Sequence, residues 1–581
     1  MTDSEFVKRV LELDPRLDAD LVKRAHDLAT RAHAGQTRES GDPYIVHAEM
    51  AAEILAQLQL DSATVAAGLL HDVVEESDMD LASIGEEFGE EIAELVDGVT
   101  KITGLKFESR EREQAENFRK MLLSVVKDVR VILIKLADRL HNMRTISHLT
   151  PAQIERISRE TREIYAPLAG RFGMARIQRE LEDLSFRWLE PDAHRKLERA
   201  LSAGRLERDA YIEQISRPIR EALEREGVGA RIFGRSKHLY SIHKKMLAQD
   251  KTVDEIYDLV AMRIITSSVS ECYRSLGTVH TLYTPIHDRI KDFIATPKLN
   301  GYRALHTTVI GPRGQMVEIQ IRTEEMHEQA EIGIAAHWTY KEGSPADDEL
   351  RESLAWVRQL LEGNIDLTEA DEFLELLKVD LYRDEIFVFT PNGDLKHLPK
   401  GSTPIDFAYS IHTDVGNHCA GARIDGRMVS LKHSLENGAT VEVVTSEAAH
   451  PSRDWLGLVV TSRARSKIRH YLREQADGES VVLGRRIIDK ELKKLGPGAS
   501  DVSLDDVAQS FGLDGTQDLA AAVGRGDIGP GELERKLSPA PSRRPAIVKA
   551  FARKVRRPET GVRIKGIGDI MLSFAKCCQP V

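Results

Sequence analysis

The stretch VAAGLLHDVVEES at residues 65–77 determines the character of the N-terminal part of the chain. Its apolar residues recur at helical spacing, and His71 and Asp72 interrupt that apolar pattern. At the i+4 spacing of a helix, Glu75 lies over His71 and Glu76 over Asp72. The pattern therefore predicts a largely buried helix that carries two pairs of polar side chains.

Polar residues also interrupt two neighbouring segments. VRVILIKLADRLHNMRT at 129–145 reads as a second apolar helix and contains Asp138, with Asn142 and Thr145 on the same face. Upstream, GDPYIVH places His47 at the start of a third helix. Residues 1 to roughly 195 read as helical throughout.

Two of these helices each carry a carboxylate in an apolar setting, and an unpartnered buried carboxylate costs several kcal/mol. The set of two imidazoles and two carboxylates suits a first-row metal with open positions for water and phosphate: His47, His71, Asp72 and Asp138. The alternative is that Lys135 and Arg139 pair with the acids at an ordinary surface.

Three segments together resemble the HD-type hydrolase domain of the RelA/SpoT homologue family: HAGQTRESGDPYIVH, LLHDVVEES and LADRLHNMRT. The resemblance implies that His47, His71, Asp72 and Asp138 bind Mn²⁺. It also implies that Glu75 and Glu76 activate or position the water that attacks the 3′-pyrophosphate of (p)ppGpp. Residues implied to line the nucleotide pocket are Arg38, Asn142 and Thr145. Glu76 stands where the family more often has aspartate, and Glu39 where some members carry lysine.

Near residue 230 the pattern changes to short β-rich runs separated by helices and Gly/Pro turns, which is typical of a mixed α/β domain. GRSKHLYSIHKKM at 234–246 gathers cations where a strand meets a helix, an arrangement that can hold a triphosphate. A basic run of this kind is also common on a solvated helix face.

Two carboxylates accompany the strands that follow. Asp258 precedes the run LVAMRIIT, and MVEIQIRT at 316–323 alternates so that Glu318 shares a face with Gln320 and Arg322. Carboxylates beside a basic cluster are suited to Mg²⁺-dependent phosphoryl transfer. The alternative is an ordinary half-exposed strand.

The segments RIKDFIATPKLNGYRALHTTVIGP and VEIQIRTEEMHEQAEIGIAAHWTYKEG resemble the synthetase domain of the same family. The resemblance implies pyrophosphoryl transfer from ATP to the 3′-hydroxyl of GDP or GTP, with Mg²⁺ held by Asp258 and Glu318 and with Glu318 as the base. Residues implied to hold the ATP phosphates are Arg235, Lys237 and Lys245. Tyr302 is implied to stack on guanine. The resemblance implies that Lys298, Asn300 and His306 hold the acceptor nucleotide and that Lys291 also binds substrate. Lys291 belongs to the RxKD form found in bifunctional members.

The segment from 384 to 446 resembles a TGS domain, which in this family senses uncharged tRNA on the ribosome, with His412 near the tRNA 3′ end. The helical segment after it resembles that of long family members. Cys577 and Cys578 resemble the opening of a cysteine-containing regulatory module, so the sequence is expected to be truncated there.

The expected architecture is multidomain, with an all-α HD-type hydrolase domain, an α/β nucleotidyltransferase-like synthetase domain, a small β-grasp-like TGS domain and a helical C-terminal segment. The expected boundaries are 1–195, 196–343, a helical linker at 344–383, 384–446, a helical region with linkers at 447–545, and 546–581 for the start of the truncated module. The segments GPGAS, GRGDIGPG and SPAPSRRP within 496–545 read as linkers.

Composition narrows the class of protein further. The formal net charge of -12 argues against binding along DNA by bulk charge. The N-terminus lacks the apolar core of a secretory signal, and no apolar run is long enough to span a bilayer. With 4 cysteines a disulfide framework is not expected, which fits the cytoplasm.

These features predict a bifunctional alarmone enzyme that both makes and hydrolyses (p)ppGpp, with ATP, GDP/GTP, (p)ppGpp, deacylated tRNA and the ribosome as partners. One alternative is a ribosome- and tRNA-binding regulator with one catalytic head weak or inactive. Another is a hydrolase whose synthetase-like domain only senses nucleotides; intact Asp258, Glu318, Lys237 and Tyr302 argue against it.

Overall fold

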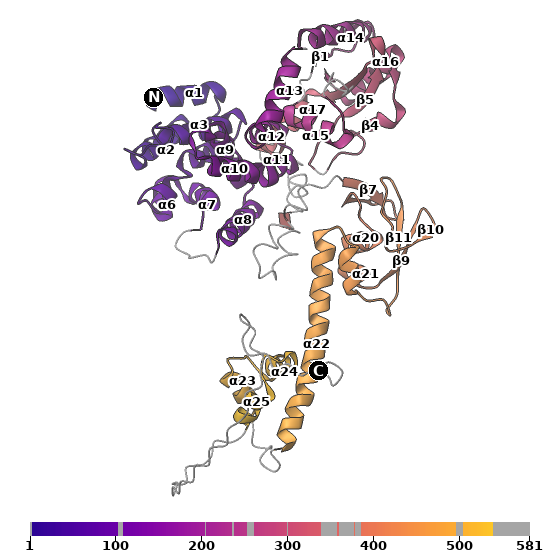
Figure 1. Cartoon of the computed structure of the whole chain (residues 1–581). Coiled ribbons are helices and arrows are strands. Elements are labelled where there is room, and N and C mark those ends of the chain that lie inside the picture. The colour runs from indigo at the N-terminus through magenta and orange to yellow at the C-terminus, as the bar shows by residue number, and fades with distance from the viewer. Residues whose placement is uncertain are drawn as a thin grey trace, which may run out of the picture. The chain divides into compact units, whose positions relative to one another are not determined.

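The computed structural model describes residues 3–102, 109–203, 205–234, 238–252, 261–298, 300–338, 357–358, 377, 385–494 and 503–537. The chain divides into two compact units, Met1–Glu474 and Gln475–Val581 (Figure 1). Among the residues described, no helix combines the length and the apolar character needed to cross a bilayer.

The first unit begins with a helical domain. Its helices are α1 (Asp3–Leu13), α2 (Ala19–Ala32), α3 (Ile45–Gln57), α4 (Ser62–Leu70), α5 (Val73–Glu76), α6 (Leu81–Phe88), α7 (Glu90–Val99), α8 (Arg110–Lys127), α9 (Arg130–Arg144), α10 (Pro151–Glu160), α11 (Ala166–Arg171) and α12 (Ala175–Leu189). Aspartates at positions 18, 61 and 80 cap the N-termini of α2, α4 and α6 by accepting backbone N–H groups. Helix α9 lies at the centre, with Ile132, Leu133 and Leu136 fully buried.

The apolar stretch at 65–77 forms two helices instead of one. Helix α4 ends at Leu70 and α5 begins at Val73, so His71 and Asp72 occupy the junction between them. The prediction of one continuous helix was wrong at this point, although the expected interruption falls at the same two residues. The backbone N–H of Glu76 still donates to the carbonyl of Asp72 at 2.9 Å.

Two helices, α13 (Pro191–Ala203) and α14 (Arg205–Arg225), lead into an α/β domain. Its strands are β1 (Arg231–Gly234), β2 (Ala261–Thr266), β3 (Thr284–Pro285), β4 (Lys291–Asp292), β5 (Leu305–Ile310) and β6 (Met316–Thr323), and its helices are α15 (Leu239–Gln249), α16 (Val269–Leu282) and α17 (Glu324–Ile332). The strand order is β1-β2-β6-β5-β3, with β4 paired to β5. Only the β2–β6 pair among these ladders is parallel, so the sheet is mixed.

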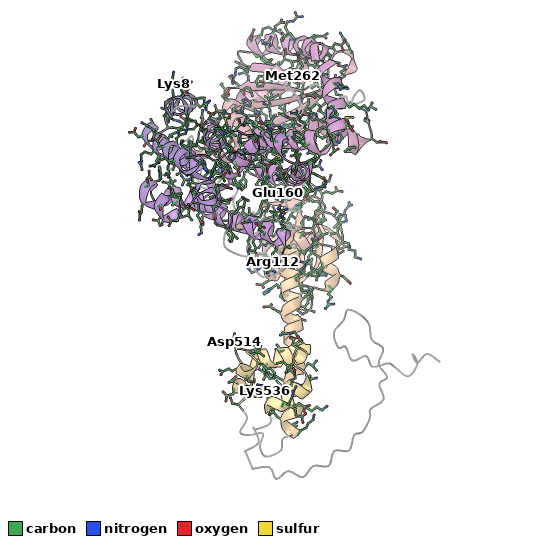
Figure 2. The ribbon with its side chains drawn as sticks, turned by 60° about the vertical axis from the view of Figure 1, so that its left-hand side comes forward. Lys8, Arg112, Glu160, Met262, Asp514 and Lys536 are labelled. Atoms are coloured by element: carbon green, nitrogen blue, oxygen red, sulfur yellow. The ribbon has the colours of Figure 1, made fainter. Side chains whose placement is uncertain are left out.

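The two faces of this sheet differ in chemistry. Val317, Ile319 and Ile321 join one apolar core with residues of α14 and α16, and that core includes Met262 of β2 (labelled in Figure 2). Gln320 and Arg322 point to the other face and are 4% and 1% exposed. The alternation predicted for β6 is therefore confirmed, but the half-exposed strand is not, because both faces are covered.

A small β-domain follows, made of β7 (Glu385–Phe389), β8 (Leu395–Pro399), α20 (Pro404–Ile411), α21 (Thr413–Asn417), β9 (Cys419–Ile424), β10 (Arg427–Val429) and β11 (Val441–Thr445). β10, β9 and β11 form one sheet and β7 and β8 another, and a bridge between Phe389 and Thr440 links the two. The buried carboxylate of Asp406 in α20 accepts the backbone N–H groups of Val460 and Thr461. These bonds connect this domain to the start of α22 (Ser462–Lys494).

The second unit contains the end of α22 with α23 (Leu504–Ser510), α24 (Thr516–Arg525) and α25 (Pro530–Leu537). Their buried side chains, among them Ile488, Leu519 and Leu533, form a core of their own. The expectation of linkers was wrong for GRGDIGPG, because Gly526 ends α24 in the left-handed conformation and Pro530 begins α25. GPGAS, SPAPSRRP, Cys577 and Cys578 lie outside the described residues, as does most of the expected linker at 344–383.

Candidate functional site

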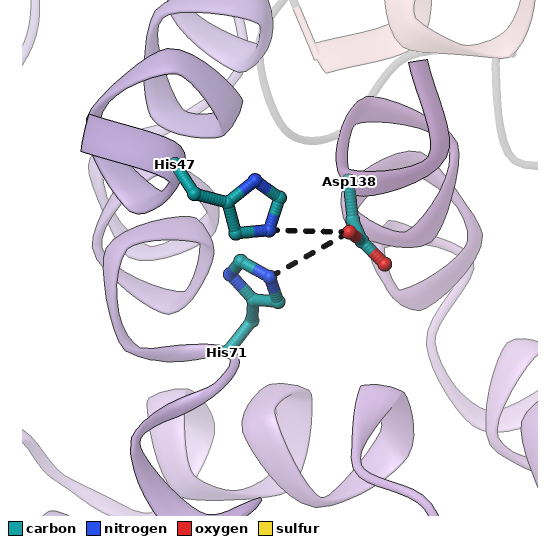
Figure 3. A group of neighbouring side chains, drawn as sticks. All are labelled: His47, His71 and Asp138. Atoms are coloured by element: carbon teal, nitrogen blue, oxygen red, sulfur yellow. Dashed lines mark ion pairs between the residues drawn. The ribbon is translucent and has the colours of Figure 1, made fainter. Parts of the chain in front are cut away.

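The predicted metal ligands converge from three places in the helical domain. His47 lies in the first turn of α3, His71 and Asp72 at the α4–α5 junction, and Asp138 in the middle of α9. Figure 3 shows both imidazoles directed at the same carboxylate, with His47 Nε2 3.3 Å and His71 Nε2 3.9 Å from Oδ1 of Asp138. Oδ2 of Asp72 lies 3.5 Å from Nε2 of His47 and 3.3 Å from Nε2 of His71.

These distances fit a shared divalent cation. Ligand atoms about 2.1 Å from one cation lie about 3–4.2 Å from one another, which is the range observed here. The potential ligand atoms of His47, His71 and Asp138 all lie within 4.8 Å of one another, and all three residues are buried. Nε2 of His71 is buried and has no hydrogen-bond partner among the described residues. An orphaned nitrogen that faces two carboxylates is a suitable metal ligand.

Electrostatics at the cluster also favour a cation. Burial lowers the pKa of His71, but the carboxylates of Asp72 and Asp138 outweigh it and raise that pKa to about 9. Burial likewise opposes the charge of Asp138, yet Lys135, His47 and His71 together hold the pKa of Asp138 well below its usual value. The site therefore concentrates negative charge, which favours binding of a cation.

The alternative of simple ion pairing accounts for only part of this cluster. Lys135 Nζ does pair with Asp138, but with the other oxygen, Oδ2, at 3.0 Å. Arg139 pairs with Glu160 instead of with the cluster. Oδ1 of Asp138 is left facing the two imidazoles.

Sequence reasoning missed two residues that touch these ligands. Tyr44 donates its hydroxyl hydrogen to Oδ2 of Asp72 at 2.9 Å, and Nδ1 of His141 lies 2.7 Å from Nδ1 of His47. Burial, with help from His47 and Arg38, lowers the pKa of His141 to about 3, so this ring is neutral. The only available signal for His141 was its position one helical turn after Asp138.

The three residues predicted to line the nucleotide pocket do lie together. Arg38 Nη2 donates to Oδ1 of Asn142 at 2.5 Å, and Nη1 to Oγ1 of Thr145 at 3.4 Å. Nδ2 of Asn142 in turn donates to Oδ1 of Asp138 at 2.5 Å. A chain of hydrogen bonds thus connects the guanidinium to the metal cluster. Glu39 is exposed beside it.

The paired carboxylates of α5 have different surroundings. Glu75 is largely buried; its Oε1 accepts the backbone N–H of Lys101 and its Oε2 the Nζ of the same residue, both at 2.7 Å. Glu76 is exposed. Burial and the carboxylate of Asp72 raise the pKa of Tyr44, and the charge of Glu76 adds to this effect. The Glu76 carboxylate therefore lies on the side of the cluster where Tyr44 meets Asp72.

The second predicted site lies on the polar face of the mixed sheet. Ladder partners put Lys291, His306, Gln320 and Arg263 in one row across four strands. Oε1 of Glu318 accepts a hydrogen bond from Nε2 of Gln320 at 3.1 Å and lies 3.9 Å from Nδ1 of His306. Glu318, the predicted base, therefore lies beside His306, which is predicted to hold the acceptor nucleotide.

Aromatic rings cluster next to this carboxylate. The Tyr302 hydroxyl lies 2.8 Å from Nε2 of His306, and the ring of Phe293 meets His306 edge-on at 5.2 Å. Nζ of Lys298 lies 5.4 Å from the centre of the Tyr302 ring. The side-chain amide of Asn300 instead donates to the carbonyl of Gly170 at 3.0 Å, a residue of the helical domain.

Not all of the predicted residues in this domain can be located. Arg235, Lys237 and Asp258 lie outside the described residues. Lys245 is half-buried in α15, and Lys291 is exposed on β4.

Sequence reasoning also missed Glu331 at the end of α17. Its carboxylate pairs with Arg179 at 2.5 Å, Arg263 at 2.9 Å and Arg322 at 3.3 Å. Although burial opposes its charge, these guanidiniums lower the pKa of Glu331. Glu331 therefore links the polar face of the sheet to α12.

Comparison with protein families gives four matches along the chain. The models are described as HD domain (residues 25–175), region found in RelA / SpoT proteins (234–345), TGS domain (386–445) and RelA/SpoT AH domain (471–538). The metal cluster lies in the first match and the polar sheet face with Glu318 in the second.

Several curated proteins are similar over nearly the whole chain. A GTP pyrophosphokinase of Myxococcus xanthus is 43% identical over 98% of this chain and 80% of its own length. The bifunctional (p)ppGpp synthase/hydrolase SpoT of Escherichia coli K12 is 42% identical over 97% of this chain and 80% of its own length. A probable guanosine-3′,5′-bis(diphosphate) 3′-pyrophosphohydrolase of Synechocystis is 46% identical over 89% of this chain and 69% of its own length.

Proposed function

The chain belongs to the RelA/SpoT family, and we propose which of its residues carry out the two reactions of a bifunctional member. It is a GTP pyrophosphokinase and a (p)ppGpp 3′-pyrophosphohydrolase: one domain transfers pyrophosphate from ATP to the 3′-hydroxyl of GDP or GTP, and the other removes it again. The substrates are nucleotides of the cytoplasm, which is where we place the enzyme.

Hydrolysis is assigned to the cluster of His47, His71, Asp72 and Asp138. When bound there, a divalent cation supplies Lewis-acid polarisation of the pyrophosphate and activation of water. Arg38 neutralises phosphate charge, and Asn142 and Thr145 hold its guanidinium in place. Glu75 and Glu76, which follow Asp72 in α5, activate or position the attacking water. The observation that carries this assignment is the convergence of two imidazoles on one carboxylate oxygen.

The metals are assigned by ligand type. Two imidazoles with two carboxylates suit Mn²⁺ better than Mg²⁺, which prefers an all-oxygen site. At the synthetase site, Asp258 and Glu318 offer oxygen ligands, which suit Mg²⁺. Assays of each reaction with Mn²⁺ alone and Mg²⁺ alone test this division. Equal support of hydrolysis by both ions would remove the basis for assigning Mn²⁺.

Synthesis is assigned to the polar face of the mixed sheet. Glu318 accepts the proton of the 3′-hydroxyl, Tyr302 stacks on guanine, and Lys298, Asn300 and His306 hold the acceptor nucleotide. Arg235, Lys237 and Lys245 neutralise the ATP phosphates, and Lys291 adds a further cation near the substrates. The short spacing between Glu318, His306 and Tyr302 supports this arrangement.

A reciprocal pair of variants tests both assignments at once. Asp72→Asn removes a metal ligand and is expected to abolish ppGpp hydrolysis while synthesis continues. Glu318→Gln is expected to lower synthesis by more than the roughly 10²–10⁴-fold typical of losing a base, because a Mg²⁺ ligand is lost as well. Each variant serves as the folding control for the other reaction.

Two outcomes contradict these assignments. Near-wild-type hydrolysis by Asp72→Asn with Mn²⁺ still bound would exclude the hydrolase cluster. An unchanged rate of synthesis in Glu318→Gln would exclude its role as base.

We also propose that the TGS domain binds the 3′ end of deacylated tRNA on the ribosome. His412 lies between α20 and α21, and its side chain is 66% exposed. Arg427, Lys432 and His433 are exposed in the same domain. The cationic groups of Arg427 and Lys432 can contact phosphates, whereas Arg423 is paired with Glu442.

Binding of deacylated and aminoacylated forms of one tRNA to the full chain tests this proposal. Deacylated tRNA is expected to bind more tightly, and His412→Ala is expected to reduce the difference. Equal binding of both forms by the wild type would refute the sensing role without affecting either catalytic assignment.

A further inference from the structure

His141 makes a close polar contact with a predicted metal ligand. Its Nδ1 lies 2.7 Å from Nδ1 of His47, and the two rings are 4.9 Å apart with a tilt of 32°. The opposite nitrogen of His47, Nε2, faces Asp72 and Asp138. Only one of the two Nδ1 atoms in this contact can carry the hydrogen, so its position determines which nitrogen of His47 is free to bind a cation.

His71 shows how the same problem is solved at the other imidazole. Its Nδ1 lies 2.8 Å from the carbonyl oxygen of Gly68. A carbonyl oxygen can only accept, so Nδ1 of His71 carries the hydrogen and Nε2 presents a lone pair to the cluster. At His47 the partner of Nδ1 is instead a second imidazole, that of His141.

We propose that His141 is a positioning residue for hydrolysis, which accepts a hydrogen bond from Nδ1–H of His47 and so directs the Nε2 lone pair of His47 toward the metal. This inference rests on the proposed metal-dependent hydrolysis. With the opposite direction of the bond, Nε2 of His47 would carry a hydrogen pointed at Asp138 and could not ligate. Support of this kind for a ligand histidine is worth about 10–100-fold in metal affinity.

The placement of His141 gives the contact a rigid support. It is 6% exposed and lies on α9, one turn beyond Asp138. Its backbone carbonyl accepts the N–H and the hydroxyl of Thr145. One helix therefore supplies a metal ligand, a residue of the nucleotide pocket and the group that orients a ligand from α3.

Two substitutions of His141 distinguish the effect of its hydrogen-bond acceptor from the effect of its ring volume. His141→Asn places a side-chain oxygen near the position of Nδ1 and retains an acceptor. His141→Phe keeps the ring but has no acceptor. His194→Phe, at a buried histidine in α13, serves as the control for loss of a buried imidazole.

The experiment measures Mn²⁺ binding to the full chain by calorimetry, with electron spin-echo modulation to detect coordinated imidazole nitrogen. We expect His141→Phe to raise the Mn²⁺ dissociation constant by about 10–100-fold and to lose the signal of one imidazole. His141→Asn is expected to stay near the wild-type value and keep both signals, and His194→Phe to be unchanged.

Three results are decisive in the other direction. Wild-type affinity and both nitrogen signals in His141→Phe would overturn the inference, and so would equal losses in the Asn and Phe variants, because the acceptor would then be irrelevant. Should His141→Phe not fold, a loss in His141→Asn as large as that of His71→Ala would overturn it as well. If the wild type bound no Mn²⁺ through these imidazoles, the proposed hydrolase site itself would fail.

Discussion

Glu75 and Glu76 are neighbours in α5, but within the described part of the chain a cation engages only Glu75. Lys101 occupies both oxygens of Glu75, whereas Glu76 is exposed on the side of Tyr44 and Asp72. The oxygens of Glu75 are already engaged in hydrogen bonds with Lys101, whereas an exposed carboxylate can accept a hydrogen bond from a water molecule. This difference suggests that Glu76 accepts the proton and that Glu75 anchors Lys101.

Matched glutamine variants separate these two roles. Glu76→Gln is expected to lower kcat for hydrolysis by about 10²–10⁴-fold, the usual effect of losing a general base. Glu75→Gln is expected to have the smaller effect, since its amide can still accept from the backbone of Lys101. Steady-state hydrolysis of ppGpp measures both. A larger loss in Glu75→Gln would reverse the assignment.

Tyr302 offers both a ring face and a hydroxyl, and the two are separable. Tyr302→Ala is expected to weaken acceptor binding by about 1–3 kcal/mol, the value of stacking on a base. Tyr302→Phe retains the ring and loses the hydroxyl contact with His306, so the KM for GDP should rise less. If Tyr302→Ala raised only the KM for ATP, the guanine-stacking assignment would be wrong.

At the residue scale, the sequence allows functional residues to be predicted where a polar side chain interrupts an apolar periodic pattern. His71, Asp72 and Asp138 were identifiable because each polar side chain interrupts an apolar helix. His141 and Tyr44 were not, since a histidine or tyrosine at a helix end is common. The partner of His141 depends on how α9 packs against α3, and that of Tyr44 on where the α4–α5 junction lies. Glu331 was missed for the same reason: its three arginine partners come from α12, β2 and β6, which only the tertiary fold brings together.

At the level of the elements, helices α22 and α24 approach each other closely at two glycines. A Cβ added at Gly484 of α22 would lie 1.7 Å from the carbonyl oxygen of Ala520, and one at Gly524 would lie 1.9 Å from that of Ser480. Each glycine thus lets one backbone approach the other. Gly478, in the same helix, has open space around its Cβ position.

Alanine substitution should therefore have opposite effects at two glycines of α22. Gly484→Ala is expected to destabilise the second unit by about 1–3 kcal/mol or more, because backbone cannot yield as a flexible side chain does. Gly478→Ala should stabilise α22 by about 0.5–1 kcal/mol. Native-state hydrogen exchange of α24 measures the first effect in the full chain, and exchange of α22 measures the second. Unchanged protection in Gly484→Ala would mean that the two helices do not pack this closely.

The helices of this unit also show where pattern reading fails. Gly526 and Pro530 were taken as linker signals, and each does mark a helix boundary. The helices between such boundaries are short, and α23 and α25 span 7 and 8 residues. Segments of that length hardly reveal periodicity and are stabilised by burial of residues such as Val507 in α23 and Leu533 in α25.

At the scale of the whole molecule, two opposed reactions share one chain, and running both would only consume ATP. Helix α12 makes ion pairs both with α9, which carries Asp138, and with Glu331 of the α/β domain. Arg144, the last residue of α9, pairs with Glu180 of α12 at 2.6 Å. Arg179, the residue before Glu180 in α12, pairs with Glu331. Glu331 holds Arg263 and Arg322 on the sheet face that carries Glu318. Adjacent residues of α12 thus reach the two catalytic domains.

We therefore expect the two sites to be negatively coupled. A non-hydrolysable ATP analogue with GDP should lower ppGpp affinity at the hydrolase site, and ppGpp should weaken synthetase-site binding by the same factor, because coupling free energy is reciprocal. A coupling of about 1–3 kcal/mol corresponds to a factor of roughly 5–150. Calorimetric titrations in both orders, in an Asp72→Asn background that prevents hydrolysis, give this factor.

Arg179→Met tests whether α12 transmits the coupling. The substitution keeps an apolar stem and removes the ion pair with Glu331, so each ligand alone should bind with near-normal affinity while the coupling factor falls toward one in both orders. Arg187→Met, on the same helix but without an ion pair among the described residues, should leave the factor unchanged. Equal factors in the wild type and Arg179→Met would mean that coupling runs through another contact, such as the bond from Asn300 to Gly170. Affinities that do not respond to the other ligand in the parent protein would mean that the two domains act independently.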